Sequence, residues 1–123
     1  PFQHWMSFGG PKGERVRAMG LWDGGCQIGG MDKTFYLAKA ARLGVLAAAT
    51  KRLKMADGRV VVPYGVWEGD AEVDGVRIRG TFQVFESGGG WTVLVGKPLQ
   101  AEMGAVHDMK ADVVTLSLGG KTA

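Results

Sequence analysis

An aspartate ends an apolar run and is followed by two glycines, in the segment Leu21-Trp22-Asp23-Gly24-Gly25. A buried ionised carboxylate is costly unless it is paired or hydrogen-bonded, so its place after two bulky apolar residues needs a reason. Asp-Gly pairs are common in turns, which is one interpretation. The other is a catalytic carboxylate carried on a tight loop. These five residues alone leave both interpretations open.

Metal binding is a second chemistry that the sequence could carry. Residues 70–75, Asp-Ala-Glu-Val-Asp-Gly, resemble the start of a calcium loop, but the twelfth position is Thr81 where the bidentate glutamate is required. Acidic residues on the exposed face of a hairpin explain them better. His4, His107 and Cys26 are too widely spaced for a zinc set. We therefore expect no metal and no cofactor.

Nucleophilic catalysis has two weak candidates. Cys26 lacks a histidine partner nearby in sequence, and a small buried thiol is the better interpretation. His107 and Asp108 are adjacent, but a surface turn is favoured because nothing beside them supplies a nucleophile. The glycine-rich segments also lack the Gly-Lys-Ser/Thr of a phosphate-binding loop.

Length and composition indicate one globular domain. The chain has 123 residues, of which 46% are hydrophobic and 22% charged, so it can bury a modest core. No apolar run approaches the ~20 residues of a membrane span. One cysteine excludes an internal disulfide and fits a reducing, cytoplasmic compartment. Because no secretory signal is visible and the chain starts at Pro1, we expect a piece of a longer protein.

The positive charge lies in the first half of the chain. Residues 1–60 hold ten Lys/Arg and four Asp/Glu, whereas residues 61–123 hold five and eight. A small β-barrel that binds nucleic acid is therefore one hypothesis, and four tryptophans could stack on bases. The positive residues are scattered without a nucleic-acid motif, and three of the tryptophans lie in apolar strands. A solvated face is favoured, and we do not expect nucleic acid as a partner.

Twenty-one glycines, spread between apolar runs, are typical of short strands joined by tight turns. We expect residues 1–13 to be irregular and residues 14–22 to form a strand. Asp32 should cap a helix that ends at Gly44 and turns Phe35, Leu37 and neighbouring alanines to one face. Further elements are expected as hairpins 52–55/59–63 and 66–73/76–85, a buried strand 91–95, a helix from Pro98 to about Met103, and strands 105–107 and 113–118.

Two motifs in order carry a family resemblance. Leu21-Trp22-Asp23-Gly24-Gly25 is followed, some seventy residues on, by Leu94-Val95-Gly96 and a short helix. Between them lie a helix, an Ala-Asp-Gly hairpin and the strand 76–84. Over residues 14–118 this pattern resembles the retropepsin-like aspartic proteases. The segments 66–69, 80–85, 96–99 and 104–108 are similar to the proteases of gypsy-type LTR retrotransposon polyproteins, notably fungal ones.

The resemblance implies a mainly β, closed retropepsin-like barrel with one or two short helices over residues 14–123, preceded by a linker or polyprotein remnant at 1–13. It implies a homodimeric aspartic endopeptidase that cuts a retroelement polyprotein in the cytoplasm or in retroelement particles. Asp23 would be catalytic and Gly25 the motif glycine. A flap would bind an extended peptide through Met55, Ala56, Asp57 and Gly58. Residues 94–96 would support the catalytic loop, and 113–118 would contribute to the dimer interface.

The sequence departs from the family at the position after the aspartate. Gly24 stands where the family has Thr or Ser, whose hydroxyl braces the two loops across the dimer. Trp22 is larger than the usual aliphatic residue, and Cys26 stands where alanine is common. The alternative is therefore a weak or inactive module of the same fold that dimerises or binds peptides.

Overall fold

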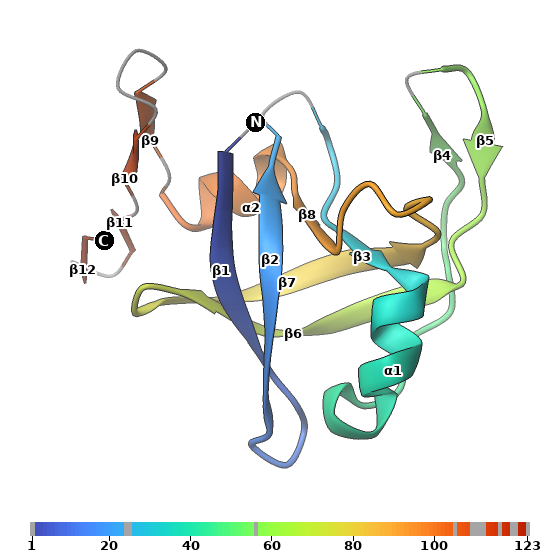
Figure 1. Ribbon diagram of the computed structural model, residues 1–123, viewed down its shortest axis with the longest axis horizontal. Helices are drawn as coiled ribbons and strands as arrows, with labels where there is room; N and C mark the ends of the chain where they lie inside the picture. Colours follow the sequence, from blue (N-terminus) through green and yellow to red (C-terminus); the bar gives the residue numbers. More distant parts are fainter. Residues whose placement is uncertain are drawn as a thin grey trace.

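Six strands close into a barrel in the order β1-β2-β8-β3-β7-β6 (Figure 1). The structure, a computed structural model, describes residues 2–23, 26–55, 57–104, 106–108, 113–115, 117–118 and 121–122. The barrel strands are β1 (Phe2–Gly9), β2 (Arg15–Trp22), β3 (Gly30–Asp32), β6 (Gly65–Val73), β7 (Val76–Phe85) and β8 (Val93–Val95). The helices are α1 (Lys33–Leu43) and α2 (Lys97–Glu102). The mainly β barrel with two short helices that we expected is thus confirmed.

The first strand corrects our interpretation of the N-terminal segment. We expected residues 1–13 to be an irregular linker, but β1 pairs with β2 from Phe2↔Trp22 to Gly9↔Arg15 and then closes the barrel on β6. Met6 and Phe8 are buried while Trp5 faces outward, which is the alternation of a half-buried strand. Residues 10–14, which begin with Gly-Pro, make the turn into β2.

Helix α1 has the two capping residues that we expected from the sequence, Asp32 and Gly44. The Asp32 carboxylate accepts a hydrogen bond from the backbone N–H of Phe35 at 3.2 Å, and Gly44 ends the helix with φ of 91°. The face it buries differs from the expected one, because Tyr36 and Leu43 are buried while Leu37 is 52% exposed. The spacing of apolar residues predicted the helix correctly, but it did not predict which face of the helix packs against the barrel.

The hairpin of β6 and β7 provides the largest part of the core. Its turn has φ of 48° at Asp74 and 84° at Gly75, as a two-residue hairpin loop requires. Trp67 and Phe82 are almost fully buried and pack with Phe8 of β1 at ring-centroid distances of 5.3 to 5.9 Å. The indole N–H of Trp67 donates to the carbonyl oxygen of Leu43 at 2.9 Å, which fastens the end of α1 to the barrel.

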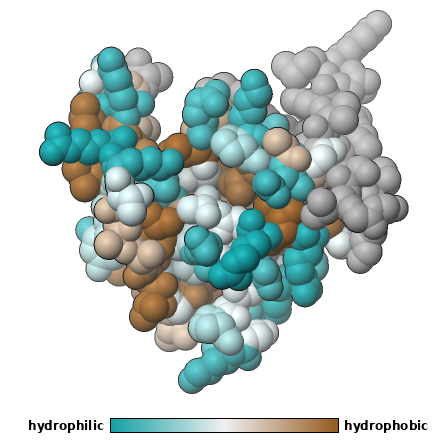
Figure 2. All heavy atoms as spheres, turned by 180° about the vertical axis from the view of Figure 1, so that it is seen from behind, coloured by the Kyte–Doolittle hydropathy of each residue, from teal (hydrophilic) through white to brown (hydrophobic). Residues whose placement is uncertain are grey.

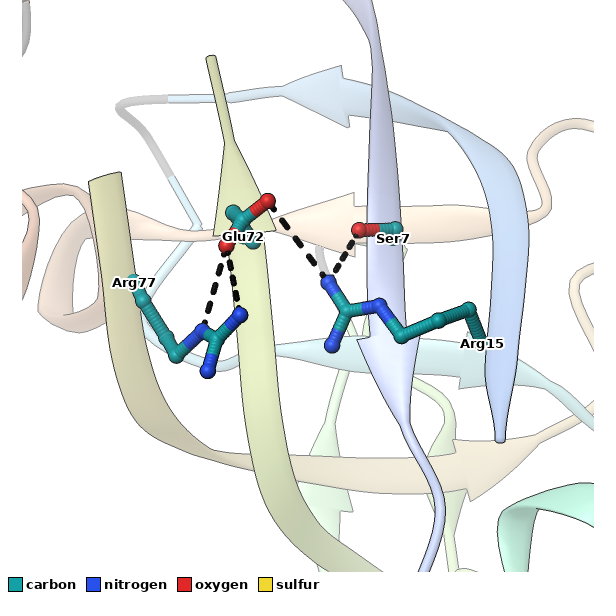
Figure 3. Close-up of polar contacts among 4 residues, drawn as sticks. All are labelled: Ser7, Arg15, Glu72 and Arg77. Carbon is teal, nitrogen blue, oxygen red and sulfur yellow. Dashed lines mark hydrogen bonds and ion pairs between the residues drawn. The ribbon is translucent and has the colours of Figure 1, made fainter. Parts of the chain in front are cut away.

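A polar cluster on the outside links four barrel strands (Figure 3). The Glu72 carboxylate accepts two hydrogen bonds from the guanidinium of Arg77, at 3.0 and 3.1 Å, and lies 3.7 Å from that of Arg15. Arg15 also donates to the hydroxyl of Ser7 at 2.6 Å. These partly exposed contacts cross β2, β1, β6 and β7, and such surface pairs each contribute at most about 1 kcal/mol.

The remaining strands pair outside the barrel. β4 (Leu53–Lys54) and β5 (Val60–Val61) form the expected hairpin around residues 56–58. β9 (Val106–Asp108) pairs with β10 (Val113–Thr115), and β11 (Ser117–Leu118) pairs with β12 (Lys121–Thr122). The expected strand 113–118 is therefore two short strands. Among the described residues no helix is long and apolar enough to cross a membrane.

Candidate functional site

The chain crosses itself at the end of β2, next to Asp23. Strands β2 and β3 are consecutive in sequence but are not neighbours in the barrel, because β8 lies between them. β8 is parallel to β2, with Trp22 opposite Val95, and antiparallel to β3, with Gly30 opposite Leu94. The connection from β2 to β3 must therefore pass around the end of β8, and this connection begins at Asp23.

Asp23 is held by its backbone while its side chain faces out. Its backbone N–H donates to the carbonyl oxygen of Val95 at 3.1 Å, and its own carbonyl accepts from the N–H of Cys26 at 3.2 Å. Trp22 is 5% exposed, whereas Asp23, one residue further along the same extended chain, is exposed. The alternation of the strand therefore turns the large indole inward and the carboxylate outward.

Gly96 lets the connection pass close to the end of β8. A β-carbon at this position would lie 1.9 Å from the carbonyl oxygen of Ile28, so no side chain fits. The next backbone N–H, that of Lys97, donates to the carbonyl oxygen of Cys26 at 2.7 Å. The segment 94–96 thus contacts the connection directly.

The β4–β5 hairpin rises on the side of the barrel at which β2 ends (Figure 1). Seen from behind, it stands as a lobe at the upper left of the molecule (Figure 2). At its tip the backbone N–H of Met55 donates to the carbonyl of Arg59 at 2.8 Å, and Gly58 has φ of 91°. Met55 is half-buried, and Asp57 and Gly58 are exposed.

The tip carries a charged contact of its own. The carboxylate of Asp57 accepts from the backbone N–H of Arg59 at 3.0 Å and from its Nε at 2.7 Å. These hydrogen bonds, the backbone one first, hold the pKa of the Asp57 carboxyl below its usual 3.8. The expected motif residues Gly24 and Gly25, and Ala56 of the tip, lie outside the described residues.

Two cavities lie beside the strands that the connection from Asp23 joins, and one of them is lined by the connection itself. One, of about 310 Å³, is lined by Leu21 of β2 together with Asp32, Trp91 and Thr92. The other, of about 340 Å³, is lined by residues 27–29 of the connection and by the outward side of β7, including Gln83. We did not single out Gln83 from the sequence. A signal was present, because it is the one polar residue in the run Phe82-Gln83-Val84-Phe85.

Cys26 and the pair His107 and Asp108 were the sequence candidates for nucleophilic catalysis. Cys26 is half-buried, and its thiol lies 3.5 Å from the carbonyl oxygen of Ile28. His107 and Asp108 belong to strand β9 and not to the surface turn that we expected. Within the described part of the chain, no three His, Cys, Asp or Glu side chains gather into a group that could hold a metal ion. Trp22 and Trp67 are core residues, while Trp91 is half-buried.

A barrel with β8 threaded between β2 and β3, and a carboxylate where β2 ends, defines a retropepsin-like fold. Comparison with solved structures agrees. The crystal structure of the retroviral protease-like domain of Ddi1 from Leishmania major is similar, with a TM-score of 0.61 over 92% of this chain and 83% of that one. The two sequences are 16% identical, so the likeness is one of fold. No family model matches the sequence, and no curated protein matches it significantly.

Proposed function

We propose that this chain is a homodimeric aspartic endopeptidase with one Asp23 per subunit. The observation that carries the proposal is the exposed carboxylate of Asp23, fixed by its backbone bond to Val95 in a retropepsin-like barrel. The other Asp-Gly pairs of the chain, at 57–58 and 74–75, lie in the turns of hairpins and do not follow a strand of this crossing. A second catalytic carboxylate would therefore come from a second copy of the chain.

The proposed reaction needs only water and the two carboxylates. Two like charges held side by side do not ionise together easily, so the pair holds one proton. The ionised Asp23 takes a proton from water, whose oxygen bonds to the peptide carbonyl carbon, while the protonated Asp23 gives its proton to the carbonyl oxygen. The tetrahedral intermediate then collapses. A proton passes to the amide nitrogen, the C–N bond breaks, and an acid and an amine leave.

The hairpin tip is the proposed flap. Met55, Ala56, Asp57 and Gly58 would close over an extended peptide, which would pair with the backbone of the flap and exclude water from the reaction. The position of the hairpin, on the side of the barrel at which β2 ends, supports this role (Figure 1).

The proposed substrate is the polyprotein of a retroelement. This part of the proposal rests on the similarity of segments 66–69, 80–85, 96–99 and 104–108 to gypsy-type retrotransposon proteases. In this proposal the protein acts in the cytoplasm or inside retroelement particles. In the same proposal, residues 113–118, which contain β10 and β11, contribute to the dimer interface.

The test is cleavage of an unfolded protein between about pH 4 and 7, a range in which a carboxylate pair can hold one proton. We expect cleavage by the native chain, inhibition by pepstatin, and loss of at least about a thousandfold in rate for Asp23→Asn. Asp74→Asn is the matched control, because it changes an Asp-Gly turn outside the crossing and asparagine tolerates the positive φ there.

Equal residual cleavage by the native chain and by Asp23→Asn would contradict the proposal and indicate a contaminating protease. Absence of cleavage by both, with a dimer present in sedimentation, would instead support the non-catalytic module of the same fold. The three outcomes therefore separate an active protease, an inactive relative and an impurity.

A further inference from the structure

The cavity beside β7 contains an unusual buried amide. Gln83 is 5% exposed and is the one buried polar or charged side chain among the described residues. Its side-chain oxygen is buried, and the described part of the chain offers it no hydrogen-bond partner. Unsatisfied polar groups of this kind are uncommon in native proteins, and each one needs an explanation. A binding site for a hydrogen-bonding group is one such explanation.

The position of this cavity relates it to the proposed active site. Gln27, Ile28 and Gly29, from the connection that starts at Asp23, line it, and the backbone N–H of Gln83 donates to the carbonyl of Gly29 at 2.8 Å. Gln27 is the fourth residue after Asp23, and four residues of extended chain span at most about 14 Å. The cavity therefore opens within a few peptide residues of the carboxylate.

A second side of the cavity leads to the flap. Lys51 lines it and lies two residues before β4, the first strand of the hairpin. The cavity is thus bounded by the Asp23 connection and by Lys51, in the segment that leads into the flap hairpin. Side chains of an extended peptide alternate in direction, so one of them can point into this space.

We propose that this cavity receives a substrate side chain ending in a carboxamide, glutamine or asparagine, within four residues of the scissile bond. The inference rests on the proposed function. A carboxamide both donates and accepts hydrogen bonds, as the amide of Gln83 does. In this proposal the amide of Gln83 turns by 180° about its last torsion, which exchanges its oxygen and nitrogen and presents the oxygen to the ligand.

Other side chains fit the cavity less well. A carboxylate can accept from the NH2 of Gln83 but leaves its oxygen without a donor, and an apolar side chain would leave the whole amide unsatisfied. The charges at the rim do not select one sign, because Lys51 and Arg79 are positive and Glu102 is negative. A neutral side chain that both donates and accepts is therefore the best complement.

The first test measures kcat/KM on peptides that differ at one position. Glutamine, glutamate and leucine are placed in turn at each of the four residues on either side of the cleaved bond. We expect one position at which glutamine is preferred over leucine by about two- to tenfold, the effect of one hydrogen bond. Gln83→Leu should abolish that preference while still cleaving the leucine peptide. Thr92→Val, which changes the other cavity, is the matched control and should retain the preference.

The second test does not depend on cleavage. The side-chain NH2 signals of Gln83, assigned by their loss in Gln83→Leu, are followed by NMR in Asp23→Asn during titration with N-acetylglutamine methylamide. We expect these signals to shift, and not to shift with N-acetylleucine methylamide. Equal responses to both compounds, or to neither, would overturn the inference.

The two tests also separate this inference from the proposed function. Cleavage with no glutamine preference, or with a preference unchanged in Gln83→Leu, would overturn the inference and leave the protease standing. A selective response of the Gln83 amide in Asp23→Asn, together with no cleavage by the native chain, would support the cavity and contradict the protease.

Discussion

The backbone N–H of Asp23 donates a hydrogen bond to the carbonyl oxygen of Val95 at 3.1 Å, across two strands that are distant in sequence. The residue after Val95 is Gly96, over which the connection from Asp23 returns to β3. The position of the candidate catalytic carboxylate therefore depends on a strand near the other end of the chain.

Gly96→Ala should destabilise the fold and abolish any activity of Asp23. The new β-carbon would lie 1.9 Å from the carbonyl oxygen of Ile28 and 2.9 Å from that of Cys26, and backbone atoms cannot move aside cheaply. Overpacking of this kind lowers the free energy of unfolding by about 1–3 kcal/mol or more. Urea unfolding followed by tryptophan fluorescence measures it.

Gly90→Ala is the control for that experiment. Its β-carbon would lie 3.6 Å from the carbonyl oxygen of Ser87, an ordinary contact, so its unfolding free energy should stay within about 0.5 kcal/mol of the native value. If Gly96→Ala were as stable as Gly90→Ala, the close passage of the connection over β8 would be wrong.

Gly24→Thr should strengthen the proposed dimer. In the family that the sequence resembles, the hydroxyl after the catalytic aspartate braces the two loops across the interface, and Gly24 lacks one. Each restored hydrogen bond should contribute about 0.5–1.5 kcal/mol, and replacing glycine also lowers the entropy of the unfolded chain. Sedimentation should show tighter association, and kcat/KM should rise. Weaker association would argue against a symmetric pairing of these loops.

Acid should loosen the tip of the proposed flap. Because the pKa of Asp57 is held below 3.8 in the folded state, its contact with Arg59 is fully present above about pH 4 and is lost as the pH falls through the lowered value. The Nε–H signal of Arg59 in NMR spectra should therefore change in this acidic range. In Asp57→Asn the same signal should not titrate. A transition at higher pH would contradict the contact.

Trp67→Phe should destabilise the attachment of α1. The substitution removes the indole N–H that donates to the carbonyl oxygen of Leu43 in a buried position, leaving that oxygen without its donor. We expect a loss of about 1–3 kcal/mol in the free energy of unfolding. Trp5→Phe changes a residue that is 51% exposed and should cost no more than about 0.5 kcal/mol. Equal effects would mean that the bond to Leu43 contributes little.

Several elements follow from short stretches of sequence. The Asp32 cap, the glycine end of α1 and the turn at Asp74-Gly75 each depend on a side chain or a backbone angle within a few residues. The hairpin around residues 56–58 and the helix that begins near Pro98 are equally local. Such elements were predicted correctly because their causes lie inside the segment that forms them.

The predictions that proved wrong concern elements whose packing partners are distant in sequence. Residues 2–9 carry the alternation of a strand, but their pairing with β2 and β6 is what makes them part of the barrel. Leu37 has the spacing of an apolar helix face, yet α1 turns Tyr36 and Leu43 to the barrel and leaves Leu37 exposed. The pairing of residues 2–9 and the buried face of α1 both depend on which segments of the folded chain pack against them.

The sequence by itself determined that Asp23 follows an apolar strand, that glycines surround it, and that a second motif ends in Gly96. Only the tertiary structure decided that β8 lies between β2 and β3, that β1 closes the barrel, and that Gln83 is buried beside a cavity. The physical reason is the range of the forces involved. Turns and caps are satisfied by near neighbours, whereas strand order and burial depend on contacts between segments that meet only when the whole chain folds.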